Sequence, residues 1–143
     1  MSGADPPPPG SVLRYAYLWA DENAAGREEG RKDRPAVVLV TVVRAAGDVQ
    51  ILGLAVSHRA PRQPHEAVLF PLQEKRRLGL DDAPAWIVTS EGNSFQWPGP
   101  DIRPIPGRTS FVYGQISPAL LRRVARSYLS NREQQRGRVV RRT

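Results

Sequence analysis

The chain contains no cysteine and only two histidines among its 143 residues. Without cysteine it can form neither disulfides nor thiolate metal sites, and it has no cysteine nucleophile. The two histidines, His58 and His65, are seven residues apart across a loop that contains prolines, a spacing that matches no common zinc pattern. No apolar run approaches the length of a membrane-spanning helix, and the N-terminus lacks the apolar stretch of a secretory signal. We therefore expect a cytoplasmic protein with no metal, no cofactor and no membrane partner.

Positive charge, by contrast, is abundant. Lys and Arg number 21 against 14 Asp and Glu, which gives a formal net charge of +7, and the sequence pI is about 10.7. A polyanion is the natural partner of such a chain. The composition changes at both ends: the prolines of residues 1–10 predict a disordered lead-in, and the Arg, Gln and Gly of residues 131–143 predict a flexible basic tail. Residues 11–130 then form one domain.

Short runs rich in β-branched and aromatic residues predict a mainly β fold. The expected strands cover residues 11–19, 34–44, 49–57, 67–70, 85–90 and 101–105, with an irregular segment over 91–100. Gly47 and Asp48 form a turn, so that the second and third of these strands pair as a hairpin.

The last long segment has apolar residues at helical spacing, so we expect it to form a helix. It begins at Ser117-Pro118, where a capping hydroxyl precedes a proline in the first turn. The apolar side of this helix carries Leu120, Leu121, Val124, Ala125, Tyr128 and Leu129, and the other side carries Arg122, Arg123 and Arg126. A shorter helix over residues 72–78 ends at Gly79. Together these elements predict a small, strongly bent sheet or barrel of antiparallel strands with a C-terminal amphipathic helix packed against it.

Residues 26–40 read GREEGRKDRPAVVLV, a charged loop that runs through Arg34 and Pro35 into an apolar strand. Proline fixes the backbone at the start of this strand, so Arg34 is held at the edge of the core. Ser57 ends the partner strand, and antiparallel pairing brings Arg34 and Ser57 together at one end of the sheet. An arginine fork suits phosphate oxygens, and a hydroxyl can assist beside it. This pair favours phosphodiester chemistry on RNA, in which the substrate's 2′-hydroxyl attacks and the protein stabilises the phosphorane.

These residues resemble the opening pattern of MazF/PemK-type toxins, the ribonuclease components of bacterial toxin–antitoxin pairs. The likeness is carried by Gly10-Ser11-Val12, Gly26-Arg27-Glu28-Glu29-Gly30 and Arg34-Pro35-Ala36-Val37-Val38-Leu39, and more weakly by Leu54-Ala55-Val56-Ser57, residues 66–69 and the final helix. It covers roughly residues 10–130. The resemblance implies an SH3-like barrel, a homodimer, and metal-independent cleavage of single-stranded RNA, with messenger RNA the expected target. It also implies 2′,3′-cyclic phosphate and 5′-hydroxyl ends, and a growth-inhibiting activity that a cognate antitoxin neutralises.

Carried over by position, the family's catalytic arginine falls on Arg34, its catalytic hydroxyl on Ser57, and its loop glutamate on Glu28 or the adjacent Glu29. Catalysis is therefore assigned to Arg34, Ser57 and Glu28. The expected RNA contacts are Arg27, Glu29, Arg31, Lys32, His58, Phe95 and Trp97, the two aromatic residues acting as stacking platforms in a polar, proline-rich loop. An arginine is a poor general base because its guanidinium stays protonated. Glu28, Glu29 and His58 are left as candidate proton acceptors.

The sequence departs from the family pattern in two places. The charged loop is longer and more basic, and the polar-acidic cluster of the late strand reads Ser90-Glu91-Gly92-Asn93-Ser94. A purely structural interpretation of both residues is also open. In it Arg34 forms an ion pair with Asp33 or Glu28 that holds the loop, and Ser57 is a hydroxyl that ends a strand. The corresponding alternatives for the whole chain are a non-catalytic basic module that binds nucleic acid or an acidic protein tail, and a basic structural or growth-regulating protein that contacts other proteins.

Overall fold

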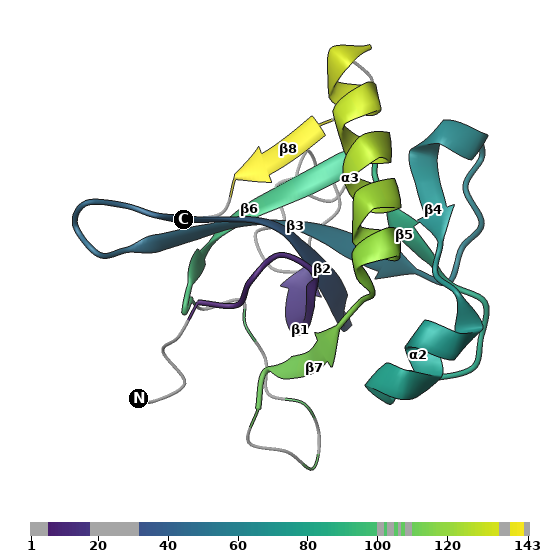
Figure 1. The fold of residues 1–143 in the computed structure, drawn as a ribbon, viewed down its shortest axis with the longest axis horizontal. Coiled ribbons are helices and arrows are strands. Elements are labelled where there is room, and N and C mark those ends of the chain that lie inside the picture. Colours follow the sequence, from purple (N-terminus) through teal and green to yellow (C-terminus); the bar gives the residue numbers. More distant parts are fainter. Residues whose placement is uncertain are drawn as a thin grey trace.

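A computed structural model describes residues 6–17, 32–99, 102, 105, 107, 110–134 and 138–141 (Figure 1). The strands are β1 Ser11–Tyr17, β2 Lys32–Val43, β3 Val49–Ser57, β4 Ala67–Leu69, β5 Trp86–Val88, β6 Glu91–Trp97, β7 Val112–Gln115 and β8 Arg138–Arg141. The helices are the 3₁₀ turn η1 Pro64–Glu66, α2 Leu72–Leu78 and α3 Pro118–Glu133. The prediction of a mainly β fold with a C-terminal helix is confirmed.

The strands form one strongly bent sheet in the order β4-β5-β3-β2-β1-β7, and β6 leaves this path to pair with β3 and β8. The hairpin of β2 and β3 is confirmed, with a turn closed by a bond from Arg44 N to Asp48 O of 2.9 Å. Gly47 has φ +89 in this turn, a conformation that favours glycine. A register shift between Val38 and Val40 marks an irregularity in β2 of the kind that increases local bending.

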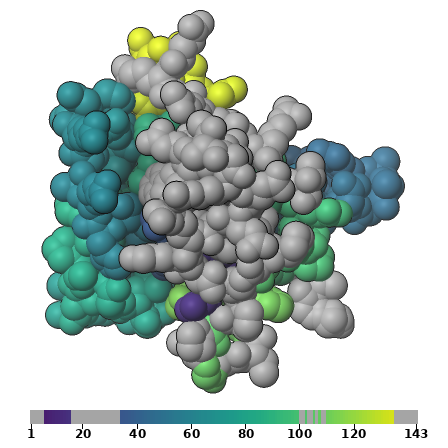
Figure 2. Space-filling view, turned by 180° about the vertical axis from the view of Figure 1, so that it is seen from behind, coloured from purple at the N-terminus to yellow at the C-terminus, as the bar shows by residue number. Residues whose placement is uncertain are grey.

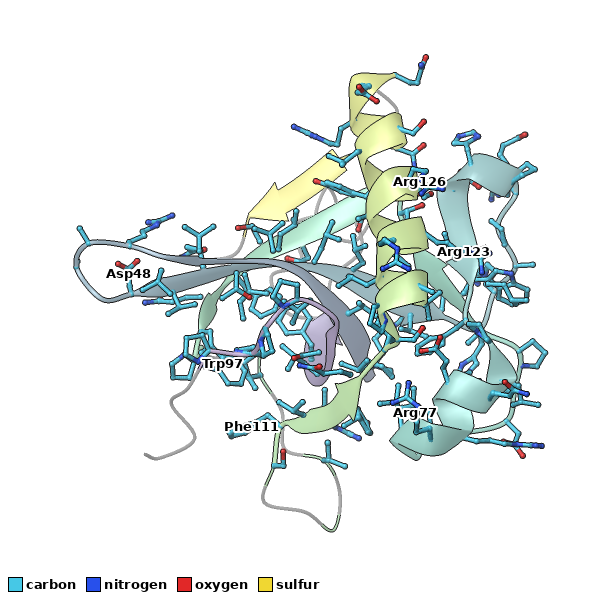
Figure 3. The ribbon with its side chains drawn as sticks, in the orientation of Figure 1. Asp48, Arg77, Trp97, Phe111, Arg123 and Arg126 are labelled. Carbon is cyan, nitrogen blue, oxygen red and sulfur yellow. The ribbon has the colours of Figure 1, made fainter. Side chains whose placement is uncertain are left out.

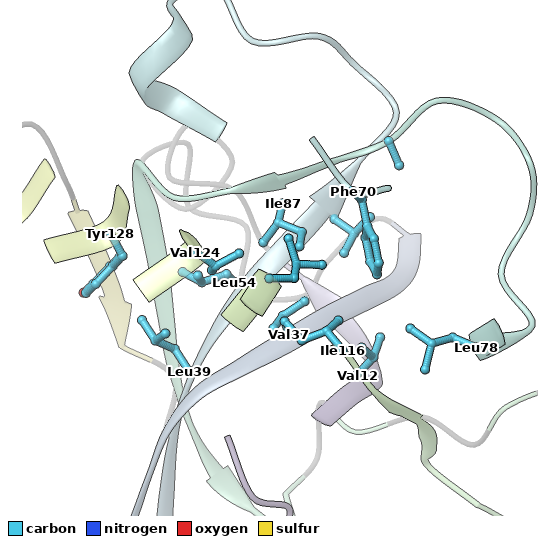
Figure 4. Close-up of a cluster of buried hydrophobic side chains, with 13 residues drawn as sticks. Val12, Val37, Leu39, Leu54, Phe70, Leu78, Ile87, Ile116, Val124 and Tyr128 are labelled. Carbon is cyan, nitrogen blue, oxygen red and sulfur yellow. The ribbon is translucent and has the colours of Figure 1, made fainter. Parts of the chain in front are cut away.

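Strand alternation gives the sheet two buried faces. The first core lies between the sheet and the helices, and it includes Val37 and Leu54 from the sheet with Val124 and Tyr128 from α3 (Figure 4). The second core lies on the opposite face. Its buried members are Leu13, Tyr15, Ala36, Val38, Val49, Ile51, Ala55, Phe95, Trp97 and Ile102. Because α3 packs on the first core and contributes nothing to the second, the second core lies on the face that α3 does not cover. Figure 2 views the molecule from that side, with the β2–β3 hairpin projecting at the edge.

Polar contacts hold α3 in place at both of its ends. The Ser117 hydroxyl accepts a bond from Leu120 N at 3.2 Å, the capping contact that the sequence predicts. Glu74 on α2 accepts bonds from Ser117 N and Ser117 Oγ, each 2.7 Å long. At the other end the buried Asn131 amide donates to the carbonyl oxygens of His65 and Thr89, at 2.9 and 3.0 Å. The helix is thereby held against α2, η1 and the end of β5.

Several expected boundaries are wrong. Residues 91–97 form the strand β6, whereas an irregular segment was predicted. The strand was missed because two of its buried positions hold the polar residues Glu91 and Asn93, so the sequence shows no apolar residue at every second position there. Of the strand expected over 101–105 the structure describes Ile102, which forms an isolated bridge with Tyr15, and Ile105, which lies in no strand. The sequence reasoning also missed β7, and residues 138–141 of the tail expected to be flexible pair parallel with β6 as β8. Residues 18 and 19 of the first expected strand lie outside the described part.

Candidate functional site

Arg34 and Ser57 occupy corresponding positions at the end of the hairpin. The last backbone pair between β2 and β3 joins Ala36 to Ala55, so the same register continued for two residues puts Arg34 opposite Ser57. Alternation places Arg34 on the side of Ala36 and places Ser57 on the side of Ala55, and both alanines belong to the second core. Beyond that last pair the strands take different partners, since Arg34 pairs with Tyr15 on β1 and Ser57 with Trp86 on β5.

The two side chains are each half-buried. The Ser57 hydroxyl oxygen accepts a bond from Arg59 N at 3.0 Å, the local contact of a turn hydroxyl. This bond engages an oxygen lone pair and leaves the hydroxyl hydrogen for another acceptor. Within the described ranges no protein acceptor takes that hydrogen. Ser57 can therefore keep its place in the turn and still donate to a phosphate oxygen.

The structure adds polar groups from β6 to this face. Glu91 is 8% exposed and Asn93 is fully buried, and alternation places both on the side of Phe95 in the second core. The Asn93 side chain bonds through Oδ1 to the Tyr15 hydroxyl at 3.4 Å. Among the described residues its Nδ2, like Nε1 of Trp97, is buried without a hydrogen-bond partner. An unpaired buried amide costs about 1–3 kcal/mol, so this nitrogen is a donor that a ligand could use.

Tyr15 connects Asn93 to Arg34. Its backbone pairs with Arg34 in β1 and β2, while its hydroxyl bonds to Asn93 on β6. Its ring is stacked on Phe95 with centroids 4.2 Å apart. The polar groups thus lie beside an aromatic pair that joins β1 to β6, two strands that are not paired with each other. Sequence reasoning had noted Glu91 and Asn93 only as a departure from the family pattern; the signal that could have placed them is the alternation of Glu91, Asn93 and Phe95 with smaller or polar residues.

The expectation that Phe95 and Trp97 form an exposed stacking platform is wrong. They are only 2% and 5% exposed. Phe95 packs so closely on Gly53 that a Cβ there would lie 3.0 Å from the ring. Trp97 meets Phe111 edge to face, with centroids 6.2 Å apart (Figure 3). The neighbouring polar residues and prolines suggested a loop, but β6 turns both rings into the second core, where their burial contributes to stability.

Most of the charged loop that precedes β2 lies outside the described residues. That segment holds Arg27, Glu28, Glu29 and Arg31, whose assigned roles stay predictions. Lys32 opens β2, and its backbone pairs with Tyr17. Its role in RNA binding also stays a prediction.

His58 is held on the α2 side of the sheet. Its Nε2 lies 3.1 Å from both carboxylate oxygens of Asp81, which follows α2. The buried Lys75 ammonium also bonds to Asp81, at 3.2 Å. Partial desolvation raises the pKa of Asp81, but hydrogen bonds from Lys75 and His58 and their charges lower it more, so the pKa lies below its ordinary value of 3.8. This contact directs His58 toward α2, so the structure does not group it with Arg34, and its role in RNA binding stays a prediction.

Among the described residues no group of three His, Cys, Asp or Glu side chains could hold a metal ion. No helix in the described part is long and apolar enough to cross a membrane. Neither a family model nor a curated protein sequence matches the chain. The likeness to MazF/PemK toxins therefore rests on the residues that carry it.

Proposed function

We propose that the protein is a toxin-type endoribonuclease that cleaves single-stranded RNA without a metal ion. The observation that carries this proposal is the placement of Arg34 and Ser57 at corresponding ends of β2 and β3, on the face where Tyr15, Glu91 and Asn93 gather. The mainly β fold with a C-terminal helix agrees with the fold that the family likeness implies.

In this mechanism the 2′-hydroxyl of the substrate attacks the adjacent phosphate and expels the 5′-oxygen of the next nucleotide. The Arg34 guanidinium donates to the phosphorane oxygens, where negative charge develops. The Ser57 hydroxyl donates beside it and helps to hold the phosphate in line. A carboxylate takes the proton of the 2′-hydroxyl, and the structure adds the buried Glu91 to the loop candidates Glu28 and Glu29. The expelled 5′-oxygen takes a proton from water, and the carboxylic acid returns its proton to the solvent, so the products carry a 2′,3′-cyclic phosphate and a 5′-hydroxyl.

The experiment for this proposal uses a long single-stranded RNA incubated with the protein in EDTA. We expect cleavage in EDTA and fragments that carry a 2′,3′-cyclic phosphate, as shown by end-group analysis. Metal-dependent cleavage with 5′-phosphate ends would overturn the mechanism. Salt-sensitive RNA binding without cleavage would instead support the non-catalytic basic module, for which the bond from Arg59 N to Ser57 is the favouring observation.

A homodimer and a cognate antitoxin belong to the same proposal. The hairpin exposes Val40, Val42 and Val43 by 42%, 48% and 62%. The N-terminal segment bonds to β2 as far as Thr41, through Gly10 N to Val38 O and Thr41 Oγ1 to Pro7 O. The surface proposed for a second copy of the chain is therefore the exposed end of the hairpin that follows. Light scattering of the native chain should give about twice 15.9 kDa, and Val42→Lys should shift it toward the monomer. A native monomer at micromolar concentration would contradict the dimer.

A further inference from the structure

Three arginines on α3 have no anionic partner among the residues that the structure describes. Arg122, Arg123 and Arg126, here called the α3 arginine cluster, are all exposed. Within the described part of the chain none of them lies within ion-pair distance of a carboxylate, although ion pairs form elsewhere on the surface. Figure 3 shows Arg123 and Arg126 projecting from the helix. The cluster is therefore a concentration of positive charge that the described residues do not neutralise.

The basic residues of α2 behave differently. Arg76 pairs with Asp82 at 3.3 Å, Arg77 with Glu74 at 3.2 Å, and Lys75 with Asp81. They also occupy the last turn of their helix, where the helix dipole stabilises cations. Local structure thus accounts for the charges of α2.

Helix stability does not account for the charges of α3. Cations stabilise the C-terminal end of a helix, but Arg122 and Arg123 lie in the N-terminal half of α3 and Arg126 lies at its middle, away from the last turn. Its first turn contains no acidic residue. Arg122 and Arg126 are also one turn apart, the spacing at which like charges repel. The cluster costs the helix stability, which indicates that it serves a partner.

The cluster is separate from the Arg34 site. α3 packs on the first core through Leu120, Val124 and Tyr128, so its arginines point away from the sheet. Arg34 lies on the side of the second core, which is the opposite face of the sheet. Figure 1 shows α3 in front of the sheet, whereas the view from behind in Figure 2 largely hides it.

We propose that the α3 arginine cluster is a second binding surface, for the phosphate backbone of single-stranded RNA. Guanidinium forks bind phosphate oxygens in pairs and also stack on bases, which an ammonium does not do. Only two of the 21 basic residues are lysine, Lys32 and Lys75, and this preference favours nucleic acid over a simple acidic peptide. The choice of RNA rests on the proposed function. The cluster holds the substrate strand on the α3 side while the Arg34 face cuts it.

The test measures binding of a fluorescent 2′-O-methyl RNA strand, which cannot be cut, by anisotropy across a range of salt. The test variant is Arg122→Gln/Arg123→Gln/Arg126→Gln, and the control is Arg76→Gln/Arg77→Gln, whose arginines are already paired. Each phosphate contact in a single strand contributes about 0.7 to the slope of log K against log salt. We expect the test variant to lose about 2 from the slope and to bind roughly 10- to 100-fold more weakly at low salt. The control should stay within about twofold of the native protein, because its charges contact no phosphate.

Three outcomes overturn the proposal. The first is an unchanged salt slope of RNA binding in the test variant, and the second is a control variant that loses as much RNA affinity per arginine as the test variant. For the third, binding of poly-glutamate is measured in the same way, and the test variant loses that binding but keeps RNA binding. The last would assign the cluster to an acidic protein segment. Circular dichroism confirms that both variants are folded before binding is compared.

A parallel arm measures cleavage of natural RNA at saturating concentration. If the native protein cuts, the test variant should keep its single-turnover rate while Arg34→Ala loses it. Loss of this rate in the test variant would overturn the separation of the two surfaces. If the native protein does not cut, the proposed nuclease function fails, while the binding arm still decides whether the cluster holds RNA.

Discussion

The two faces of the central sheet are built from the same strands but have different contents. The first face is apolar, and α3 covers it through Leu120, Val124 and Tyr128. The second face combines apolar rings with Arg34, Asn93 and other polar groups, including a buried amide nitrogen for which the described residues offer no hydrogen-bond partner. The strands β2 and β3 contribute alternate residues to the two faces. The same hairpin therefore supplies the apolar core on one face and the candidate site on the other. Changes on the two faces should therefore separate stability from activity.

The largest effect is expected from Arg34→Ala. If the guanidinium stabilises the phosphorane, its loss should lower the rate of RNA cleavage by about 10²–10³. RNA affinity should fall much less, because the other arginines still attract phosphate. Single-turnover kinetics and anisotropy measure the two quantities separately. Arg44→Ala is the matched control, since Arg44 pairs with Asp48 at the hairpin tip. Equal losses of cleavage rate and RNA affinity in Arg34→Ala would show that Arg34 binds phosphate without stabilising the transition state.

A pair of buried substitutions tests the contrast between the faces directly. Leu54 is fully buried in the first core, so Leu54→Ala should lower the free energy of unfolding by about 2–5 kcal/mol and leave the rate per folded molecule unchanged. Asn93→Leu on the second face removes an amide that is only half satisfied, so stability should change by less than about 1 kcal/mol while cleavage falls. Urea unfolding and single-turnover rates provide the readouts. The same response from both variants would remove the distinction between the faces.

The smallest effect concerns pH and the contact between Asp81, Lys75 and His58. The pKa of Asp81 is lower in the folded protein, so its contribution to stability is complete above the ordinary value of 3.8 and is lost as pH falls through the folded value. In Asp81→Asn the melting temperature should therefore fall less steeply below about pH 4 than in the native protein. Asp82→Asn is the control, because Asp82 pairs with the exposed Arg76. A native-like acid transition in Asp81→Asn would show that another carboxylate dominates.

Strong local signals made much of the fold predictable from the sequence. Ser117-Pro118 and Gly79 marked a helix start and a helix end, and Gly47 marked the hairpin turn. These features depend on neighbours in the chain. No local pattern in residues 138–141 predicts the parallel pairing of β8 with β6, because this pairing depends on contacts between segments that are far apart in the sequence.

The candidate site was predictable only in part for a related reason. Arg34 and Ser57 stand beside apolar strands that reveal their positions. Glu91 and Asn93 are buried polar residues, and their polarity made β6 look like a surface loop. That same misreading turned Phe95 into an expected base contact, although it packs under Tyr15. A polar residue in a strand is hard to place from sequence when it is buried in the core.

The most direct test of the account replaces one ribose in the substrate. An RNA strand with a single cleavage site is compared with the same strand carrying deoxyribose on the 5′ side of the scissile bond. The 2′-hydroxyl at that position is the proposed nucleophile, so the deoxy substitution should abolish cleavage, while binding persists through the phosphates. Cleavage of the deoxy strand at the native rate would contradict the mechanism, because the attacking group would then come from elsewhere.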